Sequence, residues 1–137
     1  MVACRVCFSG ATVIAMKPGK TGFARIIDAT RYSCRGLRAC YVHEAAFRQE
    51  ILALAILLPL SFLVARSAMQ WIMLVAPLIL LLIVELLNSA VESVVDRIGH
   101  EHHELSGRAK DMGSASVMLC LILIGCSWGG ILWTNYV

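Results

Sequence analysis

The chain has 137 residues, of which 59% are hydrophobic and only 15% are charged, with a formal net charge of +3 and a mean hydropathy of +0.78. Soluble domains average roughly 45–50% apolar and about 25% charged residues. This composition therefore argues against an ordinary soluble domain and indicates a chain that is partly solvated by lipid. The length favours a single domain, and the six cysteines, mostly in apolar or cytoplasmic segments, are expected to be free thiols.

The first twenty residues contain no apolar run of the kind found later in the chain, and they do not fit a cleaved signal peptide. We expect residues 1–20 to be a disordered N-terminal extension, with Met16 as an alternative start. Cys4 and Cys7 form a single Cys-x-x-Cys pair, which without a second pair is weak evidence for zinc. The membrane domain is then expected over residues 21–137.

A basic segment opens this domain. Phe23, Ile26 and Ile27 share one face of a helix. Four arginines populate the polar side: Arg25, Arg31, Arg35 and Arg38. The pattern predicts an amphipathic helix on the membrane surface over about residues 22–48, with Gly36 as a candidate break.

Three apolar stretches predict transmembrane helices: Ile51 to Ala65, Ala68 to Val84, and Met112 to Trp133. The second would cover about 26 Å at 1.5 Å per residue, close to the thickness of a hydrocarbon core. Flanking arginine stems extend the first stretch. The predicted spans are residues 48–66, residues 68–98 including a cytoplasmic extension, and residues 111–134. The fold class is an all-α membrane protein.

The basic residues orient these spans. Eleven of the twelve Lys and Arg residues lie before the first span or between the second and third, and only Arg66 lies on the other side. By the positive-inside rule the N-terminus and the second loop are cytoplasmic. Anionic headgroups or nucleotide phosphates are the ligands that such a face attracts.

A polar stripe follows the second apolar stretch. Glu85 is the first charge after seventeen uncharged positions, and Asn88, Glu92 and Asp96 follow it within a sector about 80° wide. A charge at the edge of an apolar span is costly, which makes it a functional hypothesis. The alternative is that these side chains only hold neighbouring helices together.

The spacing of the carboxylates suggests what the stripe does. Glu85 and Glu92 are about 10.5 Å apart along a helix axis, close enough to serve one site as a base and as a metal ligand. Hard oxygen ligands suit Mg²⁺, and Lys110 and Asp111 precede the third span at the same depth. Together they predict a phosphoryl-transfer site. The alternative of another class is a non-catalytic oligomeric membrane protein such as a channel, but the polar stripe of a channel would run along a whole span.

Four stretches carry a resemblance to a known family: "TGFARII", "GLRACYVHEAAFRQE", "VELLNSAVESVVDRIG" and "HELSGRAKDMGSA". From Thr21 to Val137 the chain closely resembles the bacterial integral-membrane diacylglycerol kinases, within the prokaryotic diacylglycerol and undecaprenol kinase superfamily. The resemblance implies a surface helix plus three transmembrane helices, assembled as a homotrimer with composite sites in the bacterial inner membrane. It implies ATP-dependent phosphorylation of sn-1,2-diacylglycerol to phosphatidic acid, and no nucleic-acid partner. Undecaprenol kinase is the alternative, although "EAAFRQE" looks more like the diacylglycerol branch.

The resemblance also implies roles for single residues. Glu85 matches the general base of the family, and Glu44 and Glu92 match ligands of the Mg²⁺ that accompanies ATP. The residues that match nucleotide contacts are Arg25, Tyr32, Glu44, Glu92, Glu101, His102, His103, Lys110 and Asp111. The residues that match the lipid-substrate site are Arg25, Glu44, Ala45, Ala46, Phe47, Arg48, Glu85, Asn88 and Ser114.

Overall fold

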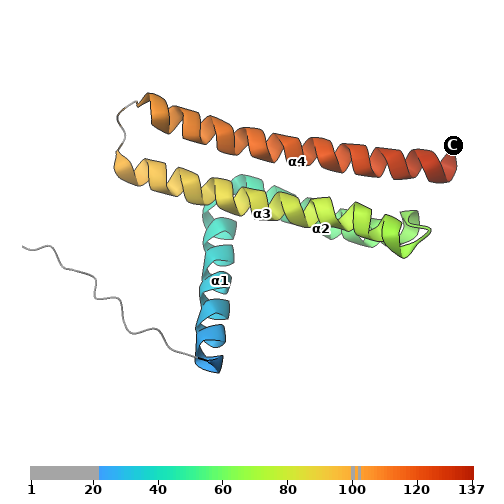
Figure 1. Ribbon diagram of the computed structural model, residues 1–137, viewed down its shortest axis with the longest axis horizontal. Helices are drawn as coiled ribbons and strands as arrows, with labels where there is room; N and C mark the ends of the chain where they lie inside the picture. Colours follow the sequence, from blue (N-terminus) through green and yellow to red (C-terminus); the bar gives the residue numbers. More distant parts are fainter. Residues whose placement is uncertain (1–21, 100, 102) are drawn as a thin grey trace, which may run out of the picture. The chain divides into compact units, whose positions relative to one another are not determined.

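The computed structural model describes residues 22–99, 101 and 103–137, and it contains four helices (Figure 1). They are α1 (Phe23–His43), α2 (Ala45–Val64), α3 (Ala68–Ile98) and α4 (Glu104–Tyr136). Within these described residues there is no strand, so the predicted all-α class is confirmed. The chain divides into two units, with the boundary between Cys34 and Arg35. The extension predicted over residues 1–20 lies outside the described residues.

α1 is one continuous helix, so the break considered at Gly36 does not occur. The helix ends because the backbone of Glu44 is extended, with φ −103° and ψ 119°. Arg48 of α2 donates from Nη1 to the carbonyl oxygens of Tyr41 and Val42, at 3.0 and 3.2 Å. Those carbonyls belong to the last turn of α1 and have no partner within that helix. The first span therefore begins at Ala45, slightly before the predicted boundary.

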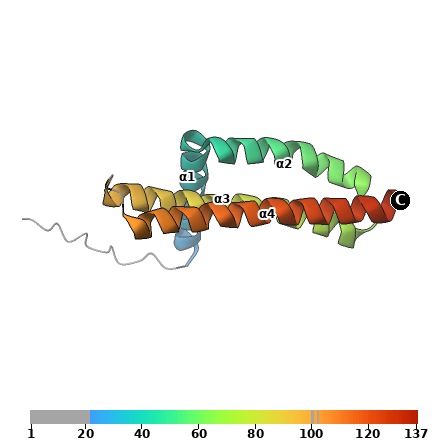
Figure 2. The ribbon, with the colours of Figure 1, turned by 90° about the horizontal axis from the view of Figure 1, so that it is seen from above.

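α2, α3 and α4 are each long and apolar enough to cross a membrane, with mean hydropathies of 1.7, 2.4 and 2.1 over their most apolar windows. They run alongside one another in both views (Figures 1 and 2). α4 begins at Glu104, seven residues before the predicted start of the third span, because His103 caps the helix through its side chain. The protein is an integral membrane protein with three membrane-spanning helices.

The buried core lies toward the α2–α3 connection. Val64, Leu74, Leu78, Trp128 and Ile131 pack together there, with contributions from all three spans. A polar link closes the same end: the buried Asn135 donates from Nδ2 to the carbonyl of Val64 at 2.8 Å. Gln70 donates from Nε2 to Asn135 Oδ1 at 3.0 Å. These contacts fix the end of α4 against the two other spans.

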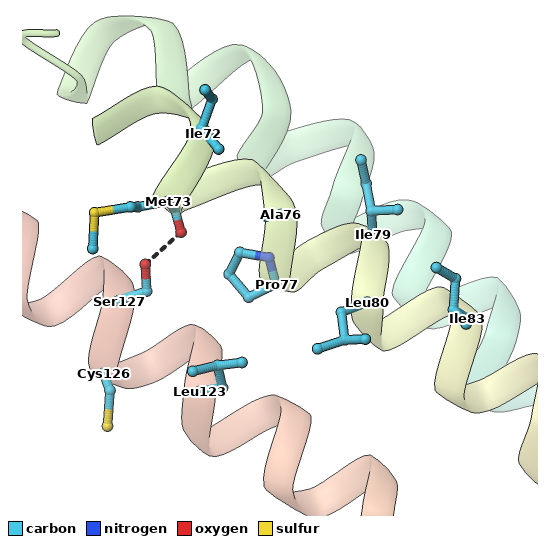
Figure 3. Close-up of a pocket in the computed structure, with 10 residues that line it drawn as sticks. All are labelled: Ile72, Met73, Ala76, Pro77, Ile79, Leu80, Ile83, Leu123, Cys126 and Ser127. Atoms are coloured by element: carbon cyan, nitrogen blue, oxygen red, sulfur yellow. Dashed lines mark hydrogen bonds between the residues drawn. The ribbon is translucent and has the colours of Figure 1, made fainter. Parts of the chain in front are cut away.

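Pro77 interrupts the hydrogen bonding of α3, and α4 compensates for it. Proline has no N–H, so the carbonyl four residues earlier, that of Met73, has no intrahelical donor. Ser127 of α4 donates to this carbonyl at 2.5 Å, as the close-up shows (Figure 3). Trp128 Nε1 donates to the next carbonyl, of Leu74, at 3.2 Å. The turn of α3 that precedes the proline is therefore hydrogen-bonded directly to the neighbouring span.

Candidate active site

Glu85 is the centre of the candidate site. It lies in α3 with only 4% of its surface exposed, and it makes no side-chain hydrogen bond to any residue that the structure describes. The charges of Glu92 and Glu44 both act on it. A buried carboxylate with a purely structural role would be paired or hydrogen-bonded. Glu85 is instead available to accept a proton or a hydrogen bond from a ligand.

A second carboxylate, that of Glu50 on α2, is close enough to Glu85 to respond to its charge. The charge of Glu85 acts on Glu50, and Glu50 Oε2 is buried without a hydrogen-bond partner in the described part of the chain. No role is predicted for Glu50 from the sequence. The signal was available, because Glu50 is the last charge before the first apolar stretch, as Glu85 is the first charge after the second.

Asn88 and Glu92 are joined on the same face of α3. Asn88 Nδ2 donates to Glu92 Oε1 at 3.0 Å. The other amide atom, Asn88 Oδ1, is buried and accepts no hydrogen bond from the described residues. It lies against the backbone of α4 at Gly113. The stripe predicted from helical periodicity is therefore real at these two positions, and it faces α4.

Glu44 stands at the junction of α1 and α2, in the N-cap position of α2. Its side chain makes no capping hydrogen bond, so the carboxylate is not used to cap the helix. It lines a pocket of about 270 Å³ together with Cys40, Ser89 and other residues of α1 and α3. Cys40 Sγ lies 3.4 Å from Ser89 Oγ, and burial raises the pKa of the Cys40 thiol above its usual value.

A polar pocket of about 260 Å³ lies where α3 and α4 meet the loop between them. Lys110, Asp96, Glu101 and His103 all line it, so three of the predicted nucleotide contacts come together. Lys110 Nζ is paired with Asp96 Oδ1 at 2.6 Å. His103 also accepts a hydrogen bond at Nδ1 from the Leu105 amide, at 3.2 Å, and so caps α4.

Most of the remaining predicted residues are exposed. Phe47 is the one buried member, with 2% of its surface exposed, so its ring faces the protein interior. His102 lies outside the described residues. The exposed members of the predicted set are Arg25, Tyr32, Ala45, Ala46, Arg48, Asp111 and Ser114.

The carboxylates of Glu44 and Glu92 carry the kind of oxygen atoms that bind a hard metal ion. No group of three or more His, Cys, Asp or Glu residues among those described could hold a metal ion. Mg²⁺ needs less from the protein, because it is typically bound by one or two carboxylates together with substrate phosphates. Within the described residues, neither Glu44 nor Glu92 has a cationic partner, so both offer hard oxygen ligands, and the charges of both act on Glu85. The chemistry of each carboxylate therefore suits a metal that arrives with a nucleotide.

These features define a small integral-membrane protein with an acidic site beside a lysine-lined pocket. The family model described as prokaryotic diacylglycerol kinase matches residues 31–132. The diacylglycerol kinase of Haemophilus influenzae is 50% identical over 112 residues, which cover 82% of this chain and 95% of that protein. The Escherichia coli K12 enzyme of the same name is 48% identical over 121 residues, or 88% and 99% of the two chains. The Pseudomonas aeruginosa enzyme is 47% identical over 114 residues, or 83% and 93%. The chain belongs to the prokaryotic diacylglycerol kinase family.

Proposed function

We propose that this protein is an ATP-dependent diacylglycerol kinase. It transfers the γ-phosphoryl group of ATP to the free hydroxyl of sn-1,2-diacylglycerol at the cytoplasmic membrane interface, and the product is phosphatidic acid. The observation that carries this proposal is the buried carboxylate of Glu85, which has no hydrogen-bond partner among the described residues and lies within the field of two further carboxylates. Membership of the family supports the same substrate class.

In the proposed reaction Glu85 accepts the proton of the lipid hydroxyl as its oxygen attacks the γ-phosphorus. The new O–P bond forms while the bond from the γ-phosphorus to the bridging oxygen breaks, and ADP leaves. General-base assistance of this kind is typically worth 10²–10⁴-fold. Burial of Glu85 keeps water away from the base, and Lys110 is the cation that would meet the negative charge of the γ-phosphate.

Glu44 and Glu92 are the proposed holders of Mg²⁺, which when bound with ATP would neutralise charge on the β- and γ-phosphates. The proposed nucleotide contacts are Arg25, Tyr32, Glu101, His102, His103, Lys110 and Asp111. The proposed lipid contacts are Arg25, Glu44, Ala45, Ala46, Phe47, Arg48, Asn88 and Ser114. The pocket shared by Glu101, His103 and Lys110 supports the nucleotide assignment.

The proposal includes residues 21–137 as the kinase unit, an inner-membrane location, a cytoplasmic N-terminus and a homotrimer with composite sites. The orientation is supported by the distribution of Lys and Arg, of which eleven lie on the proposed cytoplasmic side and one on the other side. Within one chain, only 17%, 39% and 17% of the most apolar windows of α2, α3 and α4 are buried. That leaves large helix faces for lipid or for further copies of the chain.

A phosphorylation assay tests the proposal. Purified full-length protein is given radiolabelled ATP and Mg²⁺ with diacylglycerol or undecaprenol in separate reactions. We expect labelled phosphatidic acid and little labelled undecaprenyl phosphate. Preferential labelling of undecaprenol would assign the protein to the other branch of the superfamily, and labelling of neither lipid would refute a lipid kinase.

A further inference from the structure

We propose that Gly113 is a positioning residue for the Glu92 carboxylate and that it acts through Asn88. This inference rests on the proposed role of Glu92 as a metal ligand. Gly113 lies on α4, two residues after Asp111, and it takes no part in binding any ligand itself. Gly113 contributes by having no side chain, which leaves room for the Asn88 amide against the α4 backbone.

The steric evidence is specific to this glycine. A Cβ atom added to Gly113 would overlap Asn88 Oδ1, and it would lie 3.1 Å from Asn88 Cγ and 3.7 Å from Asn88 Cβ. The same atom added to Gly125, Gly129 or Gly130 would meet nothing within 4 Å. Those three glycines are on the same helix, so a general need for small residues along α4 does not explain Gly113.

The hydrogen bond of Asn88 explains why the overlap matters. Asn88 Nδ2 donates to Glu92 Oε1 at 3.0 Å, and this bond fixes the orientation of the amide. The reverse orientation would point Oδ1 at the carboxylate, where two acceptors would repel each other. Oδ1 is therefore directed at Gly113, where it is buried and accepts no hydrogen bond from the described residues.

A methyl group at position 113 would displace the amide, because Asn88 can rotate about its side-chain torsions whereas the α4 backbone cannot move as easily. Rotation of the amide would break the bond to Glu92 and release that carboxylate to other rotamers. Groups that orient a ligating carboxylate typically change metal affinity by about 10–100-fold when they are removed. The expected consequence of Gly113→Ala is thus weaker metal binding by a carboxylate that is itself unchanged.

The test is a titration of the full chain in detergent with Mn²⁺ and a non-hydrolysable ATP analogue, in which free Mn²⁺ is measured by electron paramagnetic resonance. Turnover and thermal unfolding are measured on the same samples. We expect Gly113→Ala to weaken Mn²⁺ binding by about tenfold or more. The matched controls, Gly125→Ala and Gly129→Ala, should bind Mn²⁺ as the unchanged protein does.

Asn88→Ala and the double variant Asn88→Ala/Gly113→Ala keep the test valid even if Gly113→Ala alone unfolds. The overlap is absent in the double variant, so its melting temperature and Mn²⁺ affinity should equal those of Asn88→Ala alone. A further loss of affinity in the double variant, or unchanged binding in a folded Gly113→Ala, would overturn the inference. If the unchanged protein phosphorylates lipid while Gly113→Ala binds Mn²⁺ normally, only the role of Gly113 fails. If the unchanged protein binds no Mn²⁺ with nucleotide, the proposed metal site fails and the inference with it.

Discussion

Lys110 Nζ lies 2.6 Å from Asp96 Oδ1, so the cation proposed to meet the γ-phosphate is already paired across the α3–α4 interface. The two side chains are 41% and 59% exposed, and exposed ion pairs of this kind contribute little to stability. An incoming phosphate can therefore compete with Asp96 for the three N–H donors of the ammonium group. The pair holds Lys110 in the pocket that also contains Glu101 and His103.

If the phosphate of ATP replaces Asp96 as the partner of Lys110, substitutions of these two residues should have opposite effects on the kinase reaction. Asp96→Asn should lower the KM for MgATP, because it removes a competitor of the phosphate. Lys110→Gln should reduce kcat by about 10²–10³-fold, the range found when one preorganised donor to a developing charge is lost. Steady-state kinetics checks both, with melting temperatures as the control. An increased KM in Asp96→Asn would show that the carboxylate is needed to place the lysine.

The contact between Ser127 and Met73 predicts a coupling with Pro77. Ser127→Ala leaves the Met73 carbonyl without a donor and should cost about 0.6–1.7 kcal/mol of unfolding free energy, the range for hydrogen bonds between membrane helices. In a Pro77→Ala background the new amide N–H at position 77 can satisfy this carbonyl, so the same substitution should cost much less. Unfolding in mixed micelles measures both. Equal costs in the two backgrounds would show that Ser127 does not compensate for the proline.

The Cys40 thiol predicts a difference in reactivity within α1. Burial is the largest cause of its raised pKa, and the charges of Glu44, Glu85 and Glu50 add to it, while the hydrogen bond with Ser89 opposes them. The thiolate is the nucleophile, so iodoacetamide at pH 8 should modify the exposed Cys34 much faster than Cys40. Peptide mapping over time measures the two rates, and equal rates would contradict the burial of Cys40.

The direction of the pKa shift of Cys40 also sets its pH dependence. A folded-state pKa above the unfolded value means that this thiol contributes its full stability at neutral pH. That contribution is lost as the pH rises past the ordinary thiol value of 9.0. Cys40→Ser should remove part of the loss of stability that we expect above pH 9.0, as measured by thermal unfolding at increasing pH.

Helical periodicity was sufficient to predict the spans and the polar face of α3. A run of apolar residues sets the length of a span, and the spacing of Glu85, Asn88 and Glu92 sets which side chains share a face. Helix ends were less accurate, because they depend on local contacts. α2 and α4 both begin nearer the N-terminus than the predicted spans, which start at residues 48 and 111. The Arg48 bonds at the end of α1 and the His103 cap of α4 account for these two differences.

Contacts between helices could not be predicted from one sequence. A glycine in a membrane helix fits many packing arrangements, so nothing in the sequence distinguishes Gly113 from Gly125. In the structure, a Cβ atom added to Gly113 would overlap Asn88, whereas one added to Gly125 would have no neighbour within 4 Å. The pairing of Asp96 with Lys110 depends on the register of α3 against α4. Glu50 is different, since its place at the edge of an apolar stretch can be read from the sequence in the same way as that of Glu85. Its unpartnered Oε2 atom and the effect of the Glu85 charge on it come from the structure.

The most direct test of the proposed function is the single-turnover rate of Glu85→Gln with saturating MgATP and diacylglycerol, measured beside thermal stability in detergent. Glutamine keeps the shape and hydrogen-bonding capacity of the side chain but cannot accept the hydroxyl proton. We expect a folded protein of unchanged oligomeric state and a rate reduced by about 10²–10⁴-fold, the usual contribution of a general base. Stability should be equal or higher, because a charge has been removed from the hydrocarbon boundary. A folded variant within about threefold of the original rate, below the range of general-base catalysis, would contradict the account, and a variant that no longer folds would assign Glu85 to helix packing instead.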